Sequence, residues 1–288
     1  MRSFSLKRVG IGVLVGISAL SLSYGIWQGV RALVAREPNP HQQAMADCRA
    51  VDAQSGPIRT YGQDNVTYYC WKVQAAEGII PPSGNVLVHF DAHDDIFHQA
   101  ITPPVKFPEP GTEREKWAQT AANLNIGNWL LGAMGDGVVK QTFWVVPVWE
   151  SPSFQGTQHT GKAARRAARG RKQEPPLRIL RLGELSTAGI PRNALLHFDL
   201  DWFSCLKRVD GTSFIPTSEM IRQEIEQVAA ALEKIGLKPP SITIANSPDY
   251  CPREQWQMIQ QELLAALRRH GVIPESAPSE SRGRKGRR

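Results

Sequence analysis

Short apolar runs alternate with longer amphipathic segments from residue 65 to the last quarter of the chain. The runs have the length and apolar character of buried strands, and the longer segments have a helical period. This alternation predicts an α/β domain with a mainly parallel sheet covered on both faces. The expected strands are Val86–Asp91, Thr142–Val148, Leu177–Leu182, Ala194–Asp199 and Ser241–Ala245. The expected helices are Tyr68–Glu77, Glu113–Met134, Ser218–Ile235 and Arg253–His270.

The N-terminal segment has a different pattern. Val9–Val30 is 22 residues long, carries no charged side chain and is preceded by three cations. This length is enough to cross a bilayer as one helix. Because no small-x-small cleavage site closes the run, an uncleaved signal anchor is favoured over a cleaved signal peptide. Two cations follow the run, so the charge balance favours a single-pass membrane protein with an extracytoplasmic body, periplasmic or lumenal.

These patterns divide the chain. Residues 1–36 form the anchor with its basic flanks, and residues 37–59 are a polar, proline-punctuated linker. Residues 60–273 form the α/β domain, in which residues 155–176 are a basic, exposed and flexible insert. Residues 274–288, rich in Ser, Gly and Arg, are expected to be a disordered tail.

Composition agrees with one packed domain, and charge excludes one class of partner. The 288 residues are 41% hydrophobic and include eight Trp. The net charge of +7 comes from the anchor flanks, the insert and the tail, and without these segments the body is acidic. A nucleic acid is therefore not an expected partner of the fold.

The first chemical motif is the run NVLVHFDAHDD at residues 85–95. Side chains alternate faces along a strand, so His89, Asp91 and His93 point the same way, and Asp95 follows where the strand gives way to a loop. Oxygen and nitrogen donors at the end of a strand suit a divalent metal. The plainer interpretation of such a motif alone is a loop with capping carboxylates.

A second motif repeats this pattern in the run LLHFDLDWFS at residues 195–204. His197, Asp199 and Asp201 share one face, again after a short apolar run. The carboxyl ends of parallel strands meet at one edge of the sheet, where ligands bind. Neighbouring acids on one face repel each other unless a cation or a proton lies between them. The two motifs together therefore predict a centre of one or two metals with bridging carboxylates.

The motifs also carry a family resemblance. The run DAHDD at residues 91–95 resembles the DAHxD signature of arginases, agmatinases and other ureohydrolases, and DLD at residues 199–201 resembles their later DxD motif. HFDAHDD, NIGNW at residues 125–129 and DLDWFS are similar to a sparsely characterised branch of that superfamily that includes peptide arginases, over roughly residues 64–271. The resemblance implies a three-layer αβα arginase/deacetylase-like fold with a binuclear divalent metal centre, manganese by analogy. The ligands that it implies are Asp91, His93, Asp95, Asp199 and Asp201, with Asp91 and Asp199 bridging.

Two positions depart from the family pattern. The superfamily places a metal-ligating His upstream of the first motif, where this chain has Asp64, which can still ligate manganese. The carboxylate that arginases use on the guanidinium would fall near Ala245, and Asp249 is the nearest acid. Both departures leave the substrate open, either a small molecule or a peptide.

The function predicted from these features is metal-assisted hydrolysis of a C–N bond, with the arginine guanidinium of a peptide as one substrate. Asp95 or Asp94 would handle the proton. His89 and His197 would either act in catalysis or support the ligands, with hydrogen-bonded structural histidines as the alternative. Asp249 and Asn125 would contact the substrate.

Two other functions use the same features. An N-terminal anchor, an extracytoplasmic body and a DxD motif also describe manganese-dependent glycosyltransferases, although this leaves DAHDD unexplained. A catalytically degenerate, membrane-tethered binding protein would account for Asp64. The four Cys residues lack a zinc-finger spacing. They allow either disulfides (Cys48–Cys70 or Cys205–Cys251) or buried free thiols.

Overall fold

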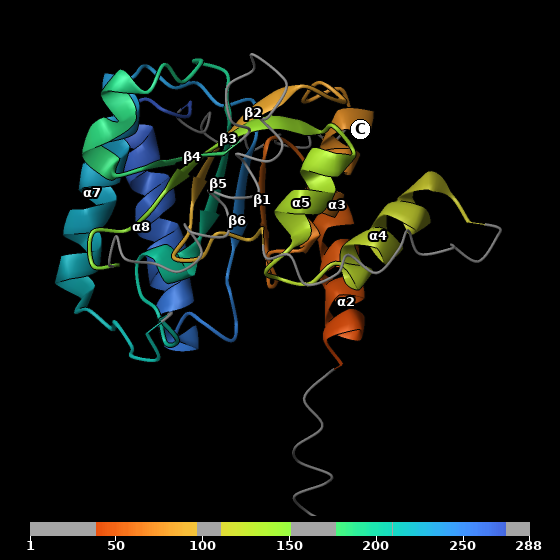
Figure 1. Ribbon diagram of the computed structural model, residues 1–288, viewed down its shortest axis with the longest axis horizontal. Helices are drawn as coiled ribbons and strands as arrows, with labels where there is room; N and C mark the ends of the chain where they lie inside the picture. Colours follow the sequence, from red (N-terminus) through yellow and green to blue (C-terminus); the bar gives the residue numbers. More distant parts are fainter. Residues whose placement is uncertain (1–38, 97–110, 151–176, 209, 275–288) are drawn as a thin grey trace, which may run out of the picture. The chain divides into compact units, whose positions relative to one another are not determined.

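The computed structural model describes residues 39–96, 111–150, 177–208 and 210–274 (Figure 1). The chain divides into two units, residues 1–42 and 43–288, and the description that follows concerns the second. The expected anchor, the basic insert and the tail from residue 275 lie outside the described residues. None of the helices that the structure describes has the length and hydropathy of a membrane span.

Six parallel strands form one sheet in the order β1-β6-β5-β2-β3-β4. The expected parallel sheet is confirmed, and each of the five expected strands is present, with small differences at its ends. β1 is an additional edge strand. The strands are β1 Ile58–Tyr61, β2 Asn85–Phe90, β3 Val139–Val145, β4 Leu177–Leu180, β5 Leu195–Asp199 and β6 Ile242–Ala245.

Helices cover both faces of this sheet, as Figure 1 shows. On one face α7 (Ser218–Lys234) and α8 (Trp256–Arg269) pack on a core that includes Val88 and Phe90 of β2. On the other face α3 (Val66–Ala76), α4 (Glu113–Asn123) and α5 (Trp129–Gly135) pack on a core that includes Leu87. The alternation of side chains along each strand thus separates two cores, and the fold has three layers.

The expected linker, residues 37–59, is wrong for most of its length. It contains helix α2 (Pro40–Asp52) and the first residues of β1. Ala44, Cys48 and Val51 of α2 are buried in the same core as α3. Their spacing of four and three residues is helical, and polar neighbours and prolines concealed it in the sequence.

The single helix expected over Glu113–Met134 is also wrong, because it breaks between α4 and α5. The Asn125 N–H donates to Oδ1 of Asn128, and the Gly127 N–H donates to Oδ1 of Asn125, each over 2.9 Å. Asparagine side chains that bond nearby backbone N–H groups compete with the helical ladder. Helix α5 begins after this break, at Trp129, and packs against α3 and β3.

The order of the strands places a switch point between β2 and β5. From β2 the chain proceeds outward to β3 and β4, and from β5 it proceeds in the opposite direction to β6. β2 and β5 are neighbours in register, with His89 opposite His197 and Phe90 opposite Phe198. Ligands of open parallel sheets bind at the carboxyl ends of such a pair.

Candidate metal centre

Five buried aspartates converge where β2 and β5 end. Asp91 follows β2, Asp199 is the last residue of β5, and Asp201 lies in the short helix η2 (Leu200–Trp202). Asp95 comes from the loop after β2, and Asp64 from the turn between β1 and α3. Each of the five is between 0 and 3% exposed. The structure thus brings together carboxylates that are up to 137 positions apart in the sequence.

The oxygen atoms form two overlapping sets. One ligand atom each from Asp64, Asp91 and Asp95 lies within 4.8 Å of the other two, and the same holds for Asp91, Asp199 and Asp201. Asp91 belongs to both sets. His93 borders the second set, with Nδ1 2.8 Å from Oδ2 of Asp201 and 3.7 Å from Oδ1 of Asp91.

This donor set fits one or two hard divalent cations. Oδ1 of Asp64 and Oδ2 of Asp91 are buried and have no hydrogen-bond partner. Among the described residues, no Lys or Arg forms an ion pair with any of the five carboxylates. Oxygen-rich sites of this kind suit Mg²⁺, Ca²⁺ or Mn²⁺.

The local backbone explains how the strand ends hold these side chains. Oδ1 of Asp91 accepts the N–H of His93 (2.6 Å), and Oδ1 of Asp199 accepts the N–H of Asp201 (2.8 Å). Oδ1 of Asp201 accepts the N–H of Ala92 over 3.2 Å and so ties the end of β5 to that of β2. The capping interpretation is therefore correct for one oxygen of each aspartate. Of the remaining oxygens, Oδ2 of Asp91 has no hydrogen-bond partner, and Oδ2 of Asp201 lies 2.8 Å from Nδ1 of His93.

Two residues at the centre have an unusual backbone conformation. Asp95 and Ser247 have φ values of 51° and 52° and are the two non-glycine residues with positive φ among those described. Ser247, in the loop after β6, is buried, and its side chain hydrogen-bonds Asp199. Such conformations cost on the order of 1–3 kcal/mol and concentrate at functional sites.

Burial and mutual repulsion change the protonation of the carboxylates. Burial, with the charge of the neighbouring aspartates, raises the pKa of Asp64, Asp91 and Asp95 well above the ordinary value. The same causes raise the pKa of Asp199 to about 7. Burial opposes protonation of His93, but the Asp201 carboxylate outweighs it and raises the pKa of His93 to about 9. Without a cation, the cluster therefore retains protons at neutral pH.

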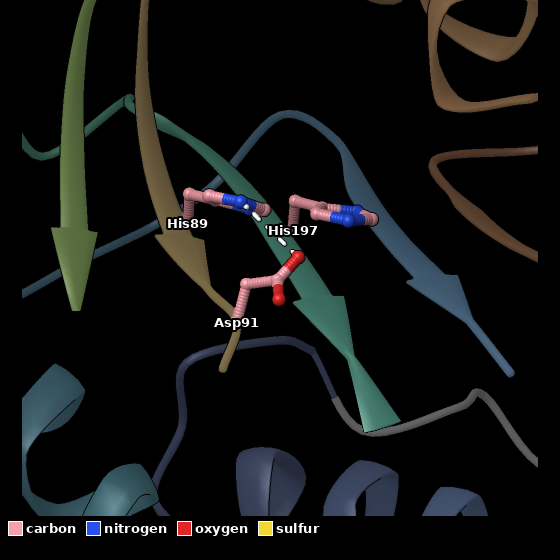
Figure 2. A group of neighbouring side chains, drawn as sticks. All are labelled: His89, Asp91 and His197. Carbon is pink, nitrogen blue, oxygen red and sulfur yellow. Dashed lines mark ion pairs between the residues drawn. The ribbon is translucent and has the colours of Figure 1, made fainter. Parts of the chain in front are cut away.

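Two histidines lie on the sheet side of the carboxylates. Figure 2 shows the imidazoles of His89 and His197 side by side on β2 and β5, with the carboxylate of Asp91 directed toward them. The rings stack at a centroid distance of 5.1 Å and an angle of 17°. Burial lowers the pKa of His89 well below its ordinary value and that of His197 to about 3. Both imidazoles are therefore neutral.

Several residues at the centre were not identified as site residues from the sequence. The Trp129 indole donates to Oδ2 of Asp95, and that of Trp144 donates to the Asp91 carbonyl over 2.9 Å. The Tyr250 ring lies 4.8 Å from the ring of His93. Cys205 offers Sγ within 4.8 Å of His93 and Asp201. Two of these residues lie in or near runs noted in the sequence: Trp129 ends NIGNW, and Cys205 is four residues after Asp201.

The predicted substrate residues are not among the converging ligand groups. Asn125 and Asp249 are exposed, and the Asn125 side chain closes the turn before α5. Asp94 is half-buried, and its Oδ1 accepts the Ile96 N–H over 3.4 Å. The four cysteines are buried free thiols, so neither of the two disulfides considered above is formed.

No family model matches the sequence. One curated relative, a glycerol-3-phosphate dehydrogenase [NAD(P)+] of Latilactobacillus sakei subsp. sakei (strain 23K), is 29% identical over 86 residues, which are 30% of this chain and 25% of that protein. This chain therefore spans only a quarter of the length of that relative.

Solved structures with a similar course of the chain include a hypothetical agmatinase of Burkholderia thailandensis and the proclavaminate amidino hydrolase of Streptomyces clavuligerus. The first is 16% identical with a TM-score of 0.44, and the match covers 81% of this chain and 64% of that one. The second is 13% identical with a TM-score of 0.48, over 81% and 70%. The arginase of Medicago truncatula is 11% identical with a TM-score of 0.44, over 80% and 65%. At these values the function has to be derived from the site.

Proposed function

We propose that this protein is a hydrolase of C–N bonds that depends on two divalent cations. The observation that carries the proposal is the position of Asp91, which belongs to both sets of converging carboxylates. A carboxylate shared by two sets is the arrangement of a binuclear site. The proposed ligands are Asp64, Asp91, Asp95, His93, Asp199 and Asp201, and the oxygen-rich donors favour manganese.

When bound, two such cations lower the pKa of a water and polarise the bond that is hydrolysed. The protein contributes the surroundings. Trp129 holds the carboxylate of Asp95 by its indole N–H, and the Ala92 N–H holds that of Asp201. Asp94 is half-buried and beside the ligands, so it is better placed than Asp95 to exchange a proton with solvent.

The proposed substrate is a guanidinium group, as in arginine or an arginine-containing peptide. The support is the resemblance of DAHDD to the ureohydrolase signature, together with the exposed acid Asp249 in the loop after β6. Excess negative charge attracts a cationic substrate. The apolar run at residues 9–30 supports the further proposal that the protein is held at a membrane with its body outside the cytoplasm.

The test is metal content and urea release of the full-length protein after loading with Mn²⁺. We expect two metal ions per chain, and urea from arginine or from arginine-containing peptides. Asp91→Ala and Asp199→Ala should each lose metal and activity by at least 100-fold, since each removes a ligand. His41→Ala, at an exposed position on α2, is the control and should lose neither.

The outcomes separate the alternatives. Full metal content in both aspartate variants would disprove the site. Two bound metal ions without urea release would keep the proposal of a metal-dependent hydrolase and would exclude a guanidinium group as its substrate. One ion or none in the unaltered protein would identify a degenerate binding protein instead. Because removal of one aspartate relieves repulsion, the variants should fold, and thermal melting of the metal-free proteins checks this.

A further inference from the structure

The stacked histidines present unused donors to the metal centre. Both ring nitrogens of His89 and the Nε2 of His197 are buried and have no hydrogen-bond partner. Oδ2 of Asp91 and Oδ1 of Asp64, on the adjoining side, are also unpartnered. Buried polar atoms without partners are rare in proteins and call for an explanation. Here several of them face the same small region.

The distances between these atoms match the edges of a metal coordination shell. Nε2 of His89 is 3.3 Å from Oδ2 of Asp91 and 3.8 Å from Oδ2 of Asp95. Nε2 of His197 is 3.5 Å from Oδ1 of Asp64. Ligands at about 2.0–2.2 Å from one ion lie roughly 3.0–3.6 Å apart when they are neighbours in its coordination shell. The three distances are too long for good hydrogen bonds. Those of 3.3 and 3.5 Å lie within the range for neighbouring ligands of one ion, and that of 3.8 Å lies just beyond it.

The surroundings of His197 orient its free nitrogen. Its Nδ1 lies 3.0 Å from the hydroxyl oxygen of Thr243, and that hydroxyl donates to the Leu196 carbonyl over 3.5 Å. The hydroxyl oxygen is therefore available to accept the Nδ1–H, which leaves the lone pair on Nε2. A ligating imidazole is held in this way, by a hydrogen bond from its other nitrogen.

Trp129 closes the region on a third side. Its ring packs edge-on at 5.7 Å from that of His89 and at 5.2 Å from that of His197. Its indole N–H donates to Asp95, so the same side chain borders the nitrogen and the oxygen donors.

We propose that His89 and His197 donate their Nε2 atoms to the ion held by Asp64, Asp91 and Asp95. This inference rests on the binuclear site of the proposed function and specifies its metals. A position with two imidazoles and carboxylates favours a later first-row metal such as Fe²⁺, Co²⁺ or Zn²⁺ over Mn²⁺. The other position, with Asp199, Asp201 and a single imidazole from His93, stays oxygen-rich. The centre therefore has one nitrogen-rich and one oxygen-rich position.

The experiment compares the full-length protein with His89→Phe. Phenylalanine fills the ring volume without nitrogen and breaks no hydrogen bond, because both nitrogens of His89 are unpartnered. Each protein is titrated with Co²⁺, and the visible absorption of bound Co²⁺ reports its ligands. Each is then dialysed against equal Zn²⁺ and Mn²⁺ and its metals are counted. His41→Phe, at an exposed position, is the matched control.

We expect the unaltered protein and His41→Phe to hold at least one Zn²⁺ per chain, and His89→Phe to hold less Zn²⁺ than either. His89→Phe should bind the first Co²⁺ roughly 10- to 100-fold more weakly, with a changed spectrum, and should retain Mn²⁺ at the other position. His197→Asn tests the second nitrogen and should weaken the same Co²⁺.

An unchanged Co²⁺ affinity and spectrum in both histidine variants would overturn this inference while two bound metals still support the proposed function. Absence of metal from the unaltered protein would overturn both. Metal-free thermal melting of each variant shows whether any loss arises from unfolding.

Discussion

The contact of Trp129 with Asp95 shows how a single core side chain can control the metal centre. The indole N–H donates to Oδ2 of Asp95, whose backbone has a positive φ. This hydrogen bond fixes the direction of the carboxylate after the backbone has turned it toward the centre. Partners of this kind around metal ligands typically contribute 10- to 100-fold in affinity.

We therefore predict that Trp129→Phe weakens metal binding by roughly 10- to 100-fold and lowers the free energy of unfolding by about 1–3 kcal/mol. Trp202→Phe is the control, because Trp202 is equally buried and its indole donates to the Val145 carbonyl over 2.8 Å. Isothermal titration and chemical denaturation measure the two effects. Equal loss of metal affinity in both variants would show that Trp129 acts through stability alone.

At the scale of elements, α2 supports the turn that presents Asp64. Oδ2 of Asp47, on α2, accepts the N–H of Gln63 over 3.1 Å, and Oδ1 accepts from the Gln43 side chain over 3.0 Å. Gly62 allows this approach, since a Cβ there would lie 2.5 Å from Oδ2 of Asp47. The helix found in the expected linker thus positions a proposed metal ligand.

Asp47→Ala should lower the free energy of unfolding by about 1–3 kcal/mol, because it leaves the buried Gln63 N–H without an acceptor. It should also weaken the metal at Asp64 several-fold. Asp47→Asn keeps an acceptor oxygen and is expected to preserve both quantities. Denaturant titration and metal titration of the two variants measure these quantities. A similar loss of stability and metal affinity in both variants would assign the effect to the charge of Asp47.

At this scale the sequence predicts features that arise within one element, and it does not predict contacts between elements. The two strand-end motifs were predictable, because alternation along β2 and β5 places His89, Asp91, His197 and Asp199 on one face and parallel pairing joins the strands. The break before α5 depends on asparagine side chains that compete with the helix. The contact of Trp129 with Asp95 exists only after α5 packs on β3 and α3. Interactions across elements leave no periodic signal in the sequence.

At the scale of the whole molecule, the buried cluster makes stability depend on pH. A group whose pKa is higher in the folded state binds more protons there, so the free energy of unfolding falls as pH rises toward the folded pKa. Burial raises the folded-state pKa of Asp64, Asp91, Asp95 and Asp199, and the Asp201 carboxylate raises that of His93, so all five groups destabilise the fold as pH rises. Burial lowers the pKa of His89 and His197, so these two groups destabilise the fold as pH falls. Their effect is confined to pH values below the unfolded imidazole pKa of about 6.5.

The metal-free protein should therefore lose stability continuously between pH 6.5 and 9, on the order of 2–3 kcal/mol, as Asp199 (pKa about 7) and His93 (pKa about 9) lose their protons. Divalent metal should reverse this trend, because it replaces those protons and binds more tightly as they leave. Chemical denaturation at several pH values, with chelator or with Mn²⁺, measures both curves. His270→Gln is the control, since surface glutamates raise the pKa of His270 as well. If its metal-free curve keeps the same slope, the loss belongs to the buried cluster, and a flat curve in the unaltered protein would contradict the prediction.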